Sequence, residues 1–146
     1  MSSDSSQATL PRAVVAGHGD FAAGLVSAVE QITGRGAQLM PIAVTGMRLE
    51  DIESMLRDRM MAAGVRVIFT DLQAGSCTMA ARRLLRGIDG AVLIAGVNLP
   101  TLLDFVFSEG SDPVQAAQHA AERGRGAIAV HANGPAGGVK PGAPGA

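Results

Sequence analysis

Short apolar runs that alternate with amphipathic helical patterns constrain the fold of this chain more than any other feature. The runs lie at residues 13–17, 37–44, 65–70 and 91–95, and they are rich in Val, Ile, Leu and Ala. After each run, apolar residues recur at helical spacing, over 21–33, 45–63, 76–85 and 101–107. This alternation is typical of an α/β fold in which helices cover both faces of a mostly parallel sheet.

The remaining chain adds one more helix and one more strand. Pro113 begins a helical pattern that continues to Glu122, and residues 126–131 form a last apolar run. Pro41 interrupts the second run, which therefore belongs near an edge of the sheet. We expect a flavodoxin-like, doubly wound sheet of five strands in the order 2-1-3-4-5.

The chain divides into one domain and two tails. Residues 1–12 are polar and Ser-rich, which predicts a disordered leader, whereas residues 13–131 contain all the periodic segments. Residues 132–146 consist largely of Gly, Ala and Pro, which predicts a flexible tail.

The composition argues against several classes of function. The formal net charge is −1, the basic residues are scattered, and the chain has no Trp or Tyr to stack on bases, so nucleic acid is not an expected partner. Cys77 is the single cysteine, and no Cys/His spacing suggests a metal site. No apolar run approaches the roughly 20 residues of a membrane span, and no signal peptide is recognisable. We therefore expect a cytoplasmic protein without metal or cofactor that does not insert into a membrane.

A histidine stands where the first buried strand ends, in the turn Gly17-His18-Gly19. The glycines let the backbone turn tightly, and the helix that follows directs its first free N–H groups toward the same crevice. The turn alone is equally compatible with a loop histidine that hydrogen-bonds nearby backbone.

A carboxylate, Asp71, follows the third strand. In the expected order strands 1 and 3 are neighbours at the switch point, so Asp71 and His18 should face each other. Asp71 could then accept a hydrogen bond from one ring N–H, which leaves the other ring nitrogen as an oriented nucleophile. Gly75 and Ser76 begin the next helix, whose free N–H groups suit a phosphoryl group. The chain has no P-loop, so we expect a phosphoprotein rather than ATP as the donor.

Three motifs at strand ends now resemble a known family. They are Gly17-His18-Gly19, the stretch from Asp71 to Ser76, and Ala95-Gly96-Val97-Asn98-Leu99-Pro100. Together they are similar to the mannose-type IIA domain (mannose/fructose/sorbose, N-acetylgalactosamine-like) of the bacterial phosphoenolpyruvate-dependent sugar phosphotransferase system.

The resemblance implies a phosphotransferase component that forms a covalent phosphohistidine. His18 would accept a phosphoryl group from phospho-HPr and pass it to a IIB protein, which serves a IIC/IID membrane permease. It also implies a homodimer in which the last strand, here about 126–131, is exchanged between subunits and runs antiparallel to the others. Besides His18, Asp71, Gly75 and Ser76, the residues expected to form the site wall or to face a partner are Gly17, Phe21, Gln73 and Asn98.

One motif departs from the mannose-specific pattern. Where those members have Asp-Thr-Trp-Gly-Gly-Ser-Pro, this chain has Asp71-Leu72-Gln73-Ala74-Gly75-Ser76-Cys77. The rim that faces the partner has therefore changed, and the chain is more similar to the galactosamine and N-acetylgalactosamine branch. The sugar itself stays open, because specificity resides in IIB and the permease.

Several residues also have simpler interpretations. Asn98 could merely cap a helix before Pro100. Cys77 is better explained as a packed small residue than as a reactive thiolate. His119 and His131 have no carboxylate in an obvious matching place.

Other functions also remain open. Arg82, Arg83 and Arg86 form a basic patch that is either a solvated face or a contact for a phosphoprotein. One alternative function is a regulatory phosphohistidine protein that reports phosphotransferase flux to a non-transport partner. A weaker alternative is a nucleotide or flavin pocket on the same fold.

Overall fold

A computed structural model of the chain describes residues 11–134. Its strands are β1 (Ala13–Gly17), β2 (Leu39–Ala43), β3 (Val67–Thr70) and β4 (Val92–Ala95). Its α-helices are α2 (Phe21–Thr33), α3 (Leu49–Ala63), α4 (Ser76–Leu84), α5 (Leu99–Phe107) and α6 (Pro113–Arg125), and its short 3-10 helices are η1 (Gly36–Gln38) and η2 (Leu85–Gly87).

The strands form one parallel sheet in the order β2-β1-β3-β4. This order confirms the first four positions of the expected arrangement, and Pro41 lies in the edge strand β2 as predicted. The register pairs Ala16 with Thr70, so β1 and β3 end side by side. The turns that follow these two strands therefore leave the same edge of the sheet.

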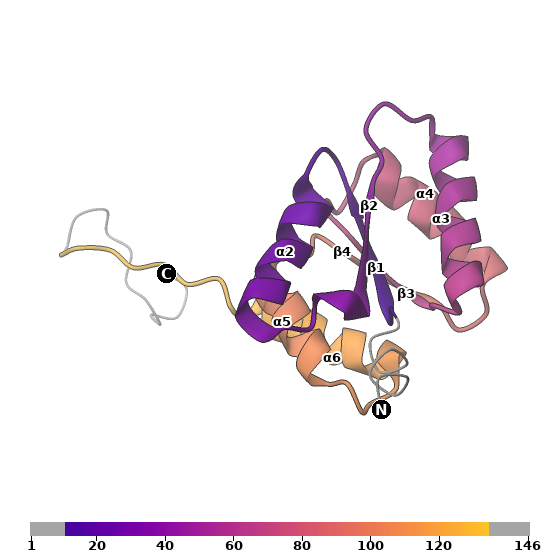
Figure 1. Cartoon of the computed structure of the whole chain (residues 1–146). Coiled ribbons are helices and arrows are strands. Elements are labelled where there is room, and N and C mark those ends of the chain that lie inside the picture. The colour runs from indigo at the N-terminus through magenta and orange to yellow at the C-terminus, as the bar shows by residue number, and fades with distance from the viewer. Residues whose placement is uncertain (1–10, 135–146) are drawn as a thin grey trace.

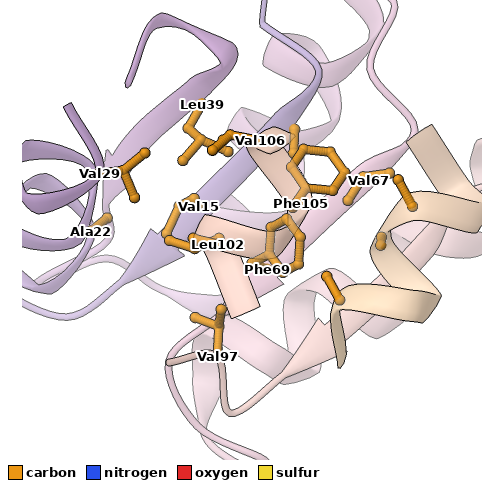
Figure 2. Close-up of a cluster of buried hydrophobic side chains, with 14 residues drawn as sticks. Val15, Ala22, Val29, Leu39, Val67, Phe69, Val97, Leu102, Phe105 and Val106 are labelled. Carbon is orange, nitrogen blue, oxygen red and sulfur yellow. The ribbon is translucent and has the colours of Figure 1, made fainter. Parts of the chain in front are cut away.

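Helices cover both faces of the sheet, with α3 and α4 on one face and α2, α5 and α6 on the other (Figure 1). Successive residues of β1 and β3 alternate between the two layers. Val15 and Phe69 point toward α2 and α5, where the Phe69 and Phe105 rings meet edge to face with centroids 5.2 Å apart (Figure 2). Val14 and Ile68 pack on the opposite face. Both central strands are thus buried on both sides, as their apolar runs predict.

Arg12 belongs to the folded domain, although its sequence position placed it in the leader. Its backbone N–H donates to the Gln38 carbonyl at 2.7 Å. Its guanidinium donates to the carbonyls of Phe105 and Ser108, at 3.1 and 3.0 Å, and lies 4.4 Å from the centroid of the Phe105 ring. A cation at the carboxyl end of α5 satisfies free carbonyls and favours the helix dipole. The rest of the leader, residues 1–10, and residues 135–146 of the tail lie outside the described residues.

The expected fifth strand is not formed in the single chain. Helix α6 continues beyond Glu122 to Arg125, and residues 126–134 contain no strand. This segment leads away from the body of the domain (Figure 1), and it exposes Ile128 and Val130 by 77% and 66%. A strand needs a neighbour for its backbone hydrogen bonds, and in this single chain the segment 126–134 pairs with none.

Two helical glycines offer a matched test of the packing between α5 and α6. A Cβ on Gly124 would overlap Thr101 Oγ1 and lie 2.8 Å from Asn98 Oδ1, whereas a Cβ on Gly24 in α2 would meet nothing within 4 Å. We expect Gly124→Ala to lower the free energy of unfolding by about 1–3 kcal/mol through this overlap. Gly24→Ala should raise it by about 0.5–1 kcal/mol, because Ala is the better helix former.

Urea unfolding of both variants, followed by circular dichroism, measures the two changes. Equal effects of the two substitutions would contradict the close packing of α6 on α5.

Candidate functional site

His18 lies in the turn that joins β1 to α2, at the carboxyl edge of the sheet. Its side chain is half exposed, with 50% of its surface accessible. The His18 carbonyl accepts a hydrogen bond from the Phe21 N–H at 3.1 Å, which closes the turn before α2. Gly19 has a φ of +52°, a backbone conformation that residues other than glycine rarely adopt. The expected position of the histidine at a strand end is therefore found.

Asp71 holds His18 by two hydrogen bonds to one oxygen. Asp71 Oδ2 lies 2.7 Å from His18 Nδ1 and 2.9 Å from the His18 backbone nitrogen. An ionised carboxylate only accepts hydrogen bonds, so Nδ1 carries the proton in this pair. When the ring is neutral, Nε2 is then left with a free lone pair, which is the arrangement of an oriented nucleophile.

The absence of a side chain at Gly17 allows this close approach. A Cβ at Gly17 would lie 3.0 Å from both Cγ and Oδ2 of Asp71, and 2.9 Å from Cδ2 of Phe21. Any larger residue at the end of β1 would push either the carboxylate or the phenyl ring away. Gly17 and Phe21, two of the expected site-wall residues, therefore lie directly beside the His18–Asp71 pair.

Two opposing effects act on the Asp71 carboxyl group. Burial alone would raise its pKa, since the side chain is only 9% exposed and its Oδ1 is buried without a partner among the described residues. The hydrogen bonds from the His18 ring and the His18 backbone outweigh that effect, and the pKa of Asp71 is lower than its usual value. Asp71 is therefore ionised at neutral pH and available to stabilise positive charge on the imidazole.

Two buried threonines, Thr70 and Thr78, hold the loop that carries Asp71. The Thr78 hydroxyl donates to the Leu72 carbonyl. The hydroxyls of Thr70 and Thr78 lie 2.8 Å apart, and both residues are almost completely buried. Because the single Thr78 proton is used on Leu72, Thr70 is the donor to Thr78. These two hydrogen bonds connect the end of β3 and the loop after Asp71 to the first turn of α4.

The start of α4 offers free N–H groups beside this loop. The helix begins at Ser76 after Gly75, whose φ of +117° requires glycine. Its first turn closes with the Met79 N–H donating to the Gly75 carbonyl at 2.9 Å. The preceding N–H groups, from Ser76 to Thr78, have no acceptor within the helix and carry the positive end of its dipole. Together with the exposed Ser76 hydroxyl, they can hold an anion next to the His18–Asp71 pair.

Thr45 supports the histidine turn from the loop that follows the edge strand β2. It follows β2, and its hydroxyl accepts a hydrogen bond from the Gly19 N–H at 2.7 Å. Thr45, Thr70 and Thr78 were not among the expected site residues. Their position was the available signal for two of them. Thr45 follows the strand that pairs with β1, and Thr70 ends the strand that leads into the Asp71 loop.

The side chain of Asn98 forms hydrogen bonds with helices α5 and α6. Its Oδ1 accepts hydrogen bonds from the N–H and the hydroxyl of Thr101, at 3.0 and 2.5 Å, so it caps α5. Its Nδ2 donates to the Gly124 carbonyl at 3.0 Å, which ties α5 to α6. The simpler interpretation of Asn98 as a cap therefore describes its contacts, and its polar atoms are directed to α5 and α6 rather than to His18. Gln73 is exposed in the loop after Asp71.

Two other residues from the sequence analysis can now be placed. Burial, followed by the nearby Asp71 charge, raises the pKa of Cys77 to about 12, so the thiol stays protonated and packed behind the site. His119 does have a carboxylate partner, contrary to expectation, because its Nδ1 lies 2.9 Å from Asp104 Oδ2. Asp104 is on α5 and His119 on α6, and only the packing of these helices brings them together.

The described residues contain no obvious metal centre and no membrane span. Within 11–134, no group of three or more His, Cys, Asp and Glu side chains is placed to hold a metal ion. None of the helices in this part of the chain is long and apolar enough to cross a membrane.

Comparisons with known proteins agree on one family. Residues 12–122 match the family model of the fructose IIA component of the phosphotransferase system (PTS). No curated protein matches the chain significantly.

Solved structures share the fold at low sequence identity. The mannose/sorbose-specific IIA subunit from Enterococcus faecalis has a TM-score of 0.75 at 20% identity, covering 84% of this chain and 96% of the subunit. Component EIIA from Streptococcus agalactiae has a TM-score of 0.64 at 22% identity, covering 77% and 93%. The PTS IIA protein associated with the fucose utilization operon of Streptococcus pneumoniae has a TM-score of 0.58 at 23% identity, covering 74% and 88%.

An isosteric substitution of Thr78 tests whether its hydrogen bonds with Thr70 and Leu72 stabilise the loop that carries Asp71. Thr78→Val leaves the Leu72 carbonyl and the Thr70 hydroxyl without their buried partner, which should lower the free energy of unfolding by about 1–3 kcal/mol. Thr78→Ser keeps the hydroxyl and should retain most of the stability. Urea unfolding gives the free energies, and amide hydrogen exchange should show faster opening of residues 71–76 in Thr78→Val alone. Equal protection of this loop in both variants would remove Thr78 from its support.

Proposed function

The chain belongs to the family of fructose-type IIA components of the phosphotransferase system, and from this premise we propose that it is a phosphocarrier protein of that system. It accepts a phosphoryl group on His18 from phospho-HPr in the cytoplasm. It then passes the group to a IIB protein, which serves a IIC/IID sugar permease in the membrane. The observation that carries this proposal is the hydrogen bond of 2.7 Å between His18 Nδ1 and Asp71 Oδ2.

The transfer step uses the nitrogen that Asp71 leaves free. The Nε2 lone pair attacks the phosphorus atom of the donor, and the bond from phosphorus to the donor breaks, its electron pair leaving with the donor. The Nδ1 proton stays between the ring and Asp71, whose negative charge compensates the positive charge that develops on the imidazole. In the onward transfer a nucleophile of IIB attacks the phosphorus atom, and the bond between phosphorus and Nε2 breaks with its electron pair returning to Nε2.

The start of α4 receives the phosphoryl oxygens in this proposal. The free N–H groups after Gly75 and the Ser76 hydroxyl donate to them, as helix N-termini do to phosphate in other proteins. No nucleotide or metal takes part, because the donor already carries an activated phosphoryl group. Most of the rate enhancement comes from holding donor phosphorus and Nε2 in line within the docked complex.

We further propose that the protein works as a homodimer that exchanges residues 126–131. Strand β4 is an edge strand, and the groove beside it has a volume of about 380 Å³, with Ile94, Gly96 and this chain's own Ile128 among its lining residues. The segment after α6 exposes Ile128 and Val130, two residues apart, as one face of a strand would. A partner segment laid against β4 would supply the fifth strand and cover these side chains.

Radioactive labelling tests the phosphocarrier function directly. We expect the purified chain to take up label from phosphoenolpyruvate in the presence of Enzyme I and HPr, and His18→Ala to take up none. His119→Ala is the matched control, since His119 also pairs Nδ1 with a carboxylate at 2.9 Å but lies far along the chain on α6. Asp71→Asn should be labelled at least about tenfold more slowly, because the amide cannot stabilise a positive ring.

Three results would contradict this proposal. They are an unlabelled wild-type chain, labelling that survives His18→Ala, and a rate of labelling that Asp71→Asn leaves unchanged.

Analytical ultracentrifugation tests the exchanged segment. Ile128→Glu places a charge where the partner's β4 would cover an apolar side chain, and we expect dimer affinity to fall by at least about 2 kcal/mol, roughly 30-fold. Ile32→Glu, on an isoleucine of α2 that is 59% exposed, changes charge equally and should leave the dimer intact. A monomeric wild-type chain, or a dimer indifferent to Ile128→Glu, would refute the exchange.

A further inference from the structure

We propose that Thr45 is a positioning residue for phosphoryl transfer, because its hydroxyl holds the peptide that follows His18 while Asp71 holds the peptide that precedes it. The inference rests on the proposed phosphocarrier function. It adds that the direction of the His18 ring is set from both neighbouring strands, so that Asp71 alone does not aim the reacting nitrogen.

The backbone groups on both sides of the His18 Cα have hydrogen-bond partners. The His18 N–H donates to Asp71 Oδ2 at 2.9 Å, and the His18 carbonyl accepts from the Phe21 N–H at 3.1 Å. The next N–H, that of Gly19, donates to Thr45 Oγ1 at 2.7 Å. Because peptide units are planar, these bonds hold the two planes that flank the His18 Cα and thereby its φ and ψ angles. The rotamers open to the ring depend on those angles.

Thr45 and Asp71 approach the histidine turn from opposite sides. Strand β1, which leads into the turn, lies between β2 and β3 in the sheet. Thr45 follows β2, and Asp71 follows β3. The peptide after His18 is therefore held from the β2 side, and the peptide before it from the β3 side. Two attachments on opposite sides prevent a swing of the turn that either one alone would allow.

The turn has little restraint from its own residues. His18 stands between two glycines, which have the greatest backbone freedom of all residues. Asp20 occupies the N-cap position of α2, yet its side chain forms no capping hydrogen bond. A capping side chain would fix the start of the helix locally. The restraint comes instead from residues that are distant in the sequence, 26 positions away for Thr45 and 53 for Asp71.

Backbone hydrogen bonds hold Thr45 itself in place. The Val44 N–H donates to the Gly17 carbonyl at 3.1 Å, which extends the pairing of β2 with β1 to the end of both strands. The Met47 N–H donates to the Val44 carbonyl at 3.3 Å and closes a turn around Thr45 and Gly46. Gly46 has a φ of +76°, which favours glycine. The β-branched side chain of Thr45 has few χ1 rotamers, so its hydroxyl has a defined place beside the end of β1.

The bond between Thr45 and Gly19 matters more for position than for stability. Both residues are exposed, so water can replace the hydroxyl at the Gly19 N–H, and its loss costs little free energy of unfolding. Without the hydroxyl the domain stays folded, but the peptide after His18 is free to rotate. A displacement of Nε2 by about 1 Å from the line of attack is enough to slow transfer strongly.

A positioning role affects both transfers of the phosphoryl group. Thr45 acts through His18, which is the nucleophile in the first transfer and the leaving group in the second. The loss of its hydroxyl should therefore slow transfer from phospho-HPr and transfer to IIB by similar factors. A residue that only contacted one partner protein would affect only the transfer that involves this partner.

Single-turnover transfer from phospho-HPr, measured by rapid quench over a range of donor concentrations, tests the proposal. We expect Thr45→Val to lower the rate at saturating donor about fivefold to twentyfold, because Nε2 is less well aimed, and to leave the half-saturating donor concentration nearly unchanged. Thr45→Ser keeps the acceptor oxygen with more freedom at χ1, and its rate should stay within about threefold of the wild type. Transfer from the phosphorylated variants to IIB should show the same order.

Thr33→Val is the matched control for the loss of a threonine hydroxyl. Thr33 Oγ1 also accepts a backbone N–H, that of Arg35 at 3.0 Å, but it lies at the carboxyl end of α2, away from His18. This variant should transfer at the wild-type rate. Amide hydrogen exchange checks the bond itself, since the Gly19 N–H should exchange faster in Thr45→Val than in the wild type, Thr45→Ser or Thr33→Val.

The outcomes separate this inference from the proposed function. No transfer to the wild-type chain would overturn the proposed function and the role of Thr45 with it. Transfer by Thr45→Val at the wild-type rate, or an equal loss in Thr45→Ser or Thr33→Val, would overturn the positioning role alone. So would a change confined to the half-saturating donor concentration or to one of the two partners, because it would make Thr45 a contact for that partner.

Discussion

The parallel pairing of β1 with β3 is the interaction on which the site depends. It aligns Ala16 with Thr70, so the turn at His18 and the loop at Asp71 leave the sheet beside each other, and one carboxylate oxygen can bind both the ring and the backbone of His18. A slip of one residue would turn every side chain of β1 to the opposite face of the sheet. Because both strands are completely buried between two helical layers, packing holds the register and thereby the distance between imidazole and carboxylate.

The features that sequence reasoning could predict are those with a signal inside one short segment, or those that follow from topology. Apolar runs that end in polar or glycine-containing turns identified the four parallel strands, and Pro41 identified the edge. The pairing of His18 with Asp71 needed only one further rule, that the carboxyl ends of neighbouring parallel strands meet at one edge. Helix α3 begins at Leu49, later than its pattern suggested, because Thr45 and Gly46 form a turn that supports the His18 loop.

The features that could not be predicted depend on side chains that meet only after folding. Arg12 is polar and precedes the first strand, yet the carbonyls at the end of α5 bring it into the domain. His119 finds Asp104 only because α5 and α6 pack together. In the sequence Thr70 and Thr78 are an ordinary strand residue and an ordinary helix residue, although their hydroxyls hold the loop between Asp71 and Ser76. The run at 126–131 has the pattern of a strand but no neighbour within one chain, and no local pattern can say whether a second chain provides one.

The charges around His18 suit the proposed phosphocarrier role, in which a group is held and then released. Asp71 is ionised, and in the proposed phosphorylated form the imidazole ring would separate it from a phosphoryl group on Nε2, so the carboxylate would support the ring without trapping the phosphate. Among residues 11–134, no Lys or Arg forms an ion pair or hydrogen bond with His18 or Asp71. The start of α4 supplies only the partial charges of N–H groups and a hydroxyl. A full cation at this position would bind the phosphorylated form more strongly than the transition state requires and would slow its onward transfer.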